Sequence, residues 1–137
     1  MRVGTPPVIQ MAALEHALSV WEGVDMADLR AASVRLCELF IKEVEARCPD
    51  MTLASPRDAA QRGSQVSFAF EHGYAAMQAL IDRKVIGDFR APNIMRFGFT
   101  PLFIDDADVM KAVDVIEEVI TKRLWDNETY KRKALVT

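Results

Sequence analysis

Residues 93–100 alternate between large apolar side chains and other residues, which is the pattern of a β-strand with one buried face. The apolar face carries Met95, Phe97 and Phe99, and the opposite face carries Ile94, Arg96 and Gly98. Residues 64–70 alternate in the same way, with an apolar face of Val66, Phe68 and Phe70. Because both apolar faces must be buried in one core, Arg96 is predicted to point away from that core.

Apolar residues at helical spacing predict four helices. They cover residues 11–21, 25–47, 74–84 and 105–124. Thr5, Asp25 and Asp105 are expected to cap three of these helices, because such side chains accept hydrogen bonds from the amides of a helix N-terminus. The apolar stripes of the helices are expected to pack in the same core as the strands. The stripe of the first helix consists of Met11, Leu14, Leu18 and Trp21.

Two shorter strands are predicted at residues 51–55 and 85–89. The order of elements is then two helices, two strands, a helix, two strands and a helix, with connections too short for crossover helices. This order predicts a single α+β domain over residues 1–137. Its sheet is expected to be mainly antiparallel, with three to four strands covered on one face by helices.

The composition excludes several classes of function. Seventeen Lys and Arg against twenty Asp and Glu give a net charge of -3, so the chain lacks the basic field that draws proteins to nucleic acid or anionic membranes. Its apolar runs are shorter than the ~20 residues of a membrane span, and no signal peptide is recognisable, so a cytoplasmic protein is expected. Cys37 and Cys48 would lie roughly 16 Å apart in one helix and are expected to be buried and reduced.

Arg96 and Arg90 are the candidate ligand-binding residues. Arg96 stands in the middle of a predicted strand beside Gly98, which leaves room for a ligand. Its planar guanidinium can bind a carboxylate or phosphate through two hydrogen bonds. The alternative is an arginine that reaches water or pairs with a surface acid. Arg90 is placed in a proline-containing loop, where a salt bridge to Asp88 is the stronger explanation.

The remaining polar residues are better explained by structure than by function. The acidic residues at 105, 106 and 108 fit a helix N-terminus and lack the glycine and terminal glutamate of a calcium loop, so no metal site is predicted. His16 and His72 have no catalytic partner at a recognisable spacing. Residues 131–133 are expected to form a solvated basic tail.

Three segments of the chain resemble bacterial kynureninases. They are GTPPVIQMAALEHAL at residues 4–18, RGSQVSF at residues 62–68 and GDFRAPNIMRFGFTPL at residues 87–102. The resemblance runs through nearly the whole chain and is to the C-terminal domain. Kynureninases are homodimers of the aspartate aminotransferase-like superfamily that use pyridoxal phosphate to hydrolyse kynurenine to anthranilate and alanine in tryptophan catabolism. The resemblance thus implies the small C-terminal domain of a fold type I pyridoxal-phosphate enzyme.

The resemblance also implies roles for single residues. In this family the arginine matched by Arg96, ahead of the Pro-Leu element at residues 101–102, holds the α-carboxylate of the substrate, which favours Arg96 over Arg90. A small polar residue matched by Thr5 contacts the cofactor, near its phosphate and across the dimer interface, and Gly4 beside it is a second candidate. The prolines at 6 and 7 remove backbone amides, so the Thr5 hydroxyl would have to make the contact.

The family's cofactor lysine and the acid that holds the pyridine nitrogen lie upstream of the matched segment. The resemblance therefore implies that the large cofactor domain is absent and that this chain alone is inactive. Three explanations of the short chain stay open: it is an expressed single domain, a truncated gene product or a stand-alone domain. The rival hypothesis is a free-standing α+β module that binds a carboxylate metabolite through Arg96 or mediates dimerisation.

Overall fold

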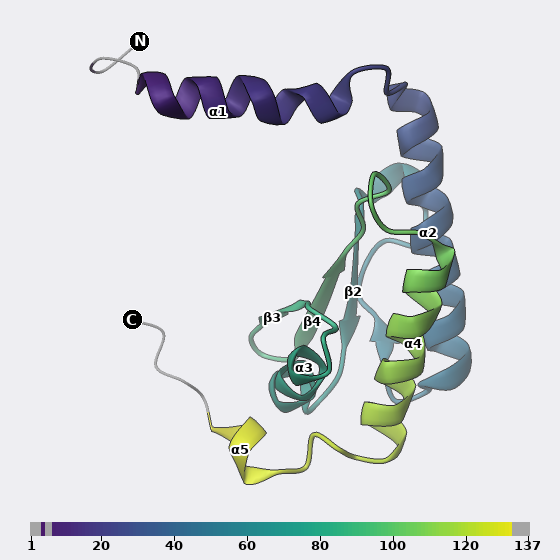
Figure 1. The fold of residues 1–137 in the computed structure, drawn as a ribbon. Coiled ribbons are helices and arrows are strands. Elements are labelled where there is room, and N and C mark those ends of the chain that lie inside the picture. The colour runs from purple at the N-terminus through teal and green to yellow at the C-terminus, as the bar shows by residue number, and fades with distance from the viewer. Residues whose placement is uncertain (1–3, 5–6, 133–137) are drawn as a thin grey trace.

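The computed structural model describes residue 4 and residues 7–132 of the chain. The helices are α1 (Val8–Leu18), α2 (Met26–Arg47), α3 (Gly73–Asp82), α4 (Asp106–Thr121) and α5 (Glu128–Lys131), with short 3-10 helices η1 (Ser19–Trp21) and η2 (Ala59–Gln61). The strands are β1 (Thr52–Leu53), β2 (Gln65–Ala69), β3 (Asp88–Arg90) and β4 (Ile94–Gly98). The predicted order of the longer elements is confirmed, and α5 adds one short helix (Figure 1). Among the described residues, no helix combines the length and apolarity that crossing a membrane requires.

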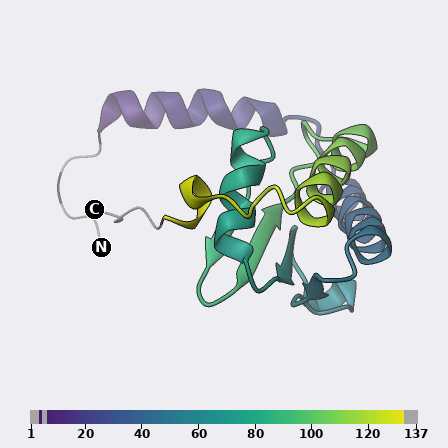
Figure 2. The ribbon, with the colours of Figure 1, turned by 90° about the horizontal axis from the view of Figure 1, so that it is seen from below.

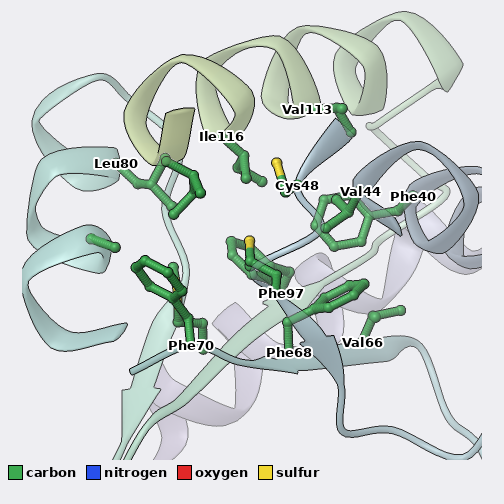
Figure 3. Packing of buried hydrophobic residues seen from close by; sticks show 14 of the residues in the cluster. Phe40, Val44, Cys48, Val66, Phe68, Phe70, Leu80, Phe97, Val113 and Ile116 are labelled. Atoms are coloured by element: carbon green, nitrogen blue, oxygen red, sulfur yellow. The ribbon is translucent and has the colours of Figure 1, made fainter. Parts of the chain in front are cut away.

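The four strands form one antiparallel sheet in the order β1-β2-β4-β3. The central pair is β2 with β4, and Ser67 lies opposite Arg96 in this pair. Helices α2, α3 and α4 form an arc over one face of the sheet (Figures 2 and 3). No helix in the described part of the chain packs on the other face. The predicted α+β domain with an antiparallel sheet covered on one face is therefore confirmed.

The hydrophobic core fills the space between the sheet and these three helices (Figure 3). The apolar faces of β2 and β4 are buried in it, as the alternation predicts. Phe40 of α2 packs over these strands, and its ring centroid lies 5.1 Å from those of both Phe97 and Phe99. Cys37 and Cys48 are buried and free, as expected, although Cys48 caps α2 rather than lying inside it.

The N-caps of two helices are as the sequence predicts, but the C-terminal end of α4 is not. Asp25 and Asp105 are confirmed as N-caps, and Asp105 forms a full capping box at the start of α4. The prediction that the last helix reaches Leu124 is wrong, because α4 ends at Thr121. Arg123 has a left-handed φ of 53°, which turns the chain back so that the partly buried Leu124 packs against the core.

The prediction that the first helix packs in the core is wrong. None of the residues of α1 is buried. The turn at Gly23, with a left-handed φ of 78°, precedes α2, and α1 extends away from the rest of the domain (Figure 1). Thr5, the predicted cap, lies outside the described residues, and Pro7 occupies the N-cap position without a side-chain hydrogen bond. Because the apolar residues of α1 lie on all sides of the helix, their spacing could not show which side would be buried.

The edge strands are shorter than predicted, and β3 is shifted. The strand expected at residues 85–89 begins only at Asp88. Val85 follows the end of α3, and its amide donates a hydrogen bond to the Leu80 carbonyl, so this amide is not available to pair with β4. A cis peptide bond between Ala91 and Pro92 lies in the connection from β3 to β4. At the other edge, β1 covers only the middle of the strand predicted at residues 51–55.

Candidate functional site

Arg96 lies on the sheet face that no described helix covers. In the antiparallel register, Ser67 of β2 and Asp88 of β3 are its direct neighbours on the two sides. Directly opposed residues of antiparallel strands project to the same face, so these three side chains form a row across the sheet. The structure thus places Arg96 away from the core, as the alternation predicts. We call Ser67, Arg96 and Asp88 the Arg96 row.

Arg96 has one acceptor within the described residues and one buried donor without any. Its Nη2 donates a hydrogen bond to the Asp88 carboxylate. Its Nε is buried and has no acceptor in the described part of the chain. A buried donor without an acceptor costs about 1–3 kcal/mol. The side chain is 30% exposed, so a ligand can still reach the guanidinium.

Asp88 is shared between two arginines. In addition to its bond with Arg96, its Oδ2 lies 3.3 Å from Nη2 of Arg90. The hydrogen bond from Arg96, aided by the charge of Arg90, holds the pKa of Asp88 below its ordinary value, so the carboxylate is ionised at neutral pH. The predicted salt bridge between Arg90 and Asp88 is confirmed.

The prediction that Arg90 lies in a loop is wrong. Arg90 is the last residue of β3 and pairs with Ile94 of β4. The error follows from the strand shift, because β3 starts three residues later than the sequence indicates and so includes Arg90. Its side chain is 63% exposed, which makes it more accessible than that of Arg96.

Gly87 allows β3 to approach β4 closely enough for this arrangement. A Cβ on Gly87 would lie 2.8 Å from the carbonyl oxygen of Arg96 and 2.7 Å from Cε of Met77. Such distances are shorter than Cβ contacts in real proteins, so only glycine fits here without a shift of the chain. Asp88 follows directly, and its position depends on this close approach.

Gly98 leaves open space, but the cavity that it lines does not include Arg96. A Cβ on Gly98 would meet no atom within 4 Å, which agrees with the predicted room near Arg96. A cavity of about 390 Å³ lies between β4, α4 and residues 83–86, and it is lined by Gly98 but not by Arg96. Among the described residues of the row, Ser67 is buried and Arg96 and Asp88 are partly exposed, so enclosure of a ligand beside Arg96 requires further walls.

The two cofactor candidates lie at the edge of the described part of the chain. Thr5 is outside the described residues, so its contact with the cofactor stays a prediction. Gly4 is exposed, has a left-handed φ of 98°, and would meet no atom within 4 Å if it carried a Cβ.

The other polar candidates have structural surroundings. His16 is exposed on α1, and His72 stacks on Trp125 with ring centroids 4.0 Å apart. The acids at residues 105 and 108 serve the capping box of α4, as expected. Within residue 4 and residues 7–132, no group of three or more His, Cys, Asp or Glu is arranged to hold a metal ion.

Every described lysine lies on a helix or directly after one. They are Lys42, Lys84, Lys111, Lys122 and Lys131, and Lys133 lies outside the described residues. Lys131 is exposed, as expected, but it does not lie in an irregular tail, because it ends α5 and its Nζ lies 2.6 Å from Oδ1 of Asp126. The cause is a cap at Asn127, whose side chain starts this short helix. No described lysine shares the sheet face of the Arg96 row.

Sequence reasoning missed Ser67 and treated Asp88 only as a partner of Arg90. A signal for Ser67 existed, because it occupies the same phase of its strand as Arg96 does of β4. The alternation along a strand shows which face a residue lies on, but not which residue lies opposite it on the next strand. The pairing of β2 and β3 with β4 places Ser67 and Asp88 beside Arg96.

Most of the chain is similar to known proteins of one kind. A family model described as the kynureninase C-terminal domain matches residues 29–116, which is more than half of the chain. The kynureninase of Pseudomonas fluorescens is 46% identical over 136 residues, which are 98% of this chain and 33% of that protein. The kynureninases of Burkholderia mallei (strain SAVP1) and Burkholderia pseudomallei (strain K96243) are each 43% identical over the same shares. The chain spans about a third of the length of the curated relatives it matches.

Proposed function

Because the chain belongs to the kynureninase family, as a C-terminal domain, we propose that it supplies the substrate-carboxylate side of a kynureninase active site. The full-length enzyme would hydrolyse L-kynurenine to anthranilate and L-alanine with pyridoxal phosphate as cofactor. Arg96 would bind the α-carboxylate of kynurenine. The match of nearly the whole chain to one part of longer enzymes does not favour a free-standing carboxylate-binding module.

The observation that supports this role best is the state of Arg96. Its guanidinium is permanently charged, lies on the face that no described helix covers and is partly exposed, and only its Nη2 is engaged by a described acceptor. A carboxylate brings both a negative charge and acceptor oxygens. Ser67, the next residue in the row, has a hydroxyl that can donate to the same group.

Pyridoxal phosphate needs a lysine for its aldehyde, an acid for its pyridine nitrogen and donors for its phosphate. The face of the Arg96 row carries no described lysine, and its acid, Asp88, already binds two arginines. The described residues therefore do not fit the cofactor by themselves. In the full-length enzyme the cofactor would act as the electron sink, while this chain binds the substrate and contacts the cofactor phosphate through Thr5.

The exposed helix α1 supports the proposal of a second domain. A helix that is apolar all round is normally covered by other protein surface, yet no residue of α1 is buried in this chain. We place the upstream large domain against α1 and over the Arg96 row, where it would supply the missing walls. The homodimer of the family and a cytoplasmic location are proposed together with this assembly.

A chimera tests the role of Arg96. Residues 1–137 replace the C-terminal third of the Pseudomonas fluorescens kynureninase, and kynurenine turnover is measured. Arg96→Lys and Arg96→Ala are expected to lose about 2–5 kcal/mol of transition-state stabilisation in kcat/KM, because the substrate carboxylate would lose its partner. Arg57→Ala, which removes an exposed arginine paired with Glu45, is the control and should leave turnover unchanged. Full turnover by Arg96→Ala would refute the carboxylate role.

The isolated chain is expected to be inactive. Mixed with pyridoxal phosphate, it should show no stable visible absorption band of a lysine-bound cofactor. A band that disappears on substitution of one lysine would contradict this expectation.

A further inference from the structure

Three features of the fold fix Asp88 beside Arg96. The two residues are directly opposed in the pairing of β3 with β4. Gly87, immediately before Asp88, approaches the Arg96 carbonyl as closely as only glycine can. The Asp88 carboxylate accepts a hydrogen bond from Nη2 of Arg96 and lies 3.3 Å from Arg90. The backbone and the side chain of Asp88 are therefore both held next to Arg96.

The charges of this cluster match a ligand with one carboxylate. Arg90 and Arg96 carry two positive charges and the ionised Asp88 carries one negative charge, so the cluster is singly positive. A single carboxylate would make it neutral. Without Asp88, two cations would share this part of the face, and Arg96 would lose its one acceptor among the described residues. A long arginine side chain without a partner samples several rotamers, and each must be given up when a ligand binds.

We propose that Asp88 is a positioning residue, which holds the guanidinium of Arg96 in the orientation that receives the α-carboxylate of the substrate. The proposal rests on the proposed function of Arg96 and extends it to a residue that need not touch the ligand. Asp88 engages Nη2, while Nη1 has no partner among the described residues and is not buried, so this end of the partly exposed guanidinium remains for a ligand oxygen.

The test compares two ligands that differ only in the carboxylate. In the chimera, KM and kcat are measured for kynurenine, and the inhibition constant is measured for kynuramine, which is kynurenine without its α-carboxylate. Asp88→Asn is expected to raise the KM of kynurenine by ~10- to 100-fold, because a misplaced binding group costs this much, and to change kcat less. The inhibition constant of kynuramine should stay within about two-fold, because this ligand has no carboxylate for Arg96 to bind. Asp88→Glu keeps the charge and should lose less than Asp88→Asn.

Asp126→Asn is the matched control. Asp126 is also an acid between two cations, Lys131 and Arg123, and its pKa is also lowered by them, but it lies after α4 and away from the sheet. This variant should leave both ligands unaffected. Circular dichroism and gel filtration show whether each variant is folded before its binding is measured.

The possible failures are distinguishable. Equal weakening of kynurenine and kynuramine by Asp88→Asn would show a general structural role and overturn the proposal. An unchanged KM in Asp88→Asn would also overturn it, while a large loss in Arg96→Ala would leave the proposed function standing. If Arg96→Ala has no effect either, the carboxylate site itself is wrong.

Discussion

Replacement of Gly87 by alanine is expected to destabilise the domain by about 1–3 kcal/mol, the usual cost of overpacking. The added Cβ would stand 2.8 Å from the carbonyl oxygen of Arg96 and 2.7 Å from Cε of Met77. The end of the methionine side chain is flexible and can move. The Arg96 carbonyl belongs to a central strand and cannot move without loss of strand pairing. The chain at Gly87 must therefore shift away from β4, and the bond between Arg96 and Asp88 weakens with it.

Gly98→Ala is the matched control for this prediction. It makes the same chemical change in β4, but its Cβ would meet no atom within 4 Å. Alanine is favoured over glycine inside a strand by roughly 0.5–1 kcal/mol, so this variant should be as stable as the parent chain or slightly more stable. Urea unfolding followed by circular dichroism gives both free energies, provided that the m values agree. If Gly87→Ala proved no less stable than Gly98→Ala, the steric reasoning would be refuted.

Four further predictions concern the stability of the same chain in urea and the reactivity of its cysteines. Asp105→Ala removes the cap of α4 and should lower the unfolding free energy by about 1 kcal/mol. An unchanged value would contradict a stabilising role of this cap. Arg62→Ala removes a side chain that is 3% exposed and bound to Glu38 and two carbonyls. A loss of about 1–3 kcal/mol is expected because the carbonyls lose their donor, and a negligible loss would show that these bonds contribute little. Burial raises the pKa of Cys48 from 9.0 to about 11, so the unfolding free energy should fall as the pH rises through this range, where only the unfolded thiol ionises. Neither Cys48 nor Cys37 should react with a thiol reagent at neutral pH before unfolding, and prompt labelling would contradict their burial.

The face of Arg96 could be predicted from the sequence, but its neighbours could not. Side chains on a strand alternate with a period of two, so the buried Met95 and Phe97 fix Arg96 on the other face. Register depends on turns and tertiary packing, which local residue patterns do not encode. Ser67 and Asp88 were therefore placed beside Arg96 only by the fold.

The errors at helix ends have one physical cause. Helices α3 and α4 both terminate at residues with left-handed backbone that are not glycine, Lys84 with φ 68° and Arg123 with φ 53°. Glycine is the usual signal for such an end, and lysine and arginine give none. The last helix was consequently predicted too long, and the strand after α3 was predicted too early.

The sheet separates the residues that stabilise this domain from those proposed to bind substrate. The buried hydrophobic residues of β2 and β4 face α2, α3 and α4, whereas Arg96 lies on the opposite face, where no described helix adds packing. A change at Arg96 therefore leaves the main core between the sheet and the helices intact, and a loss of turnover in a folded variant can be read as a loss of binding. Gly87 differs, because it touches the backbone of β4 and determines where Asp88 stands. A variant at Gly87 should lose stability and carboxylate binding together, while a variant at Asp88 should lose mainly binding.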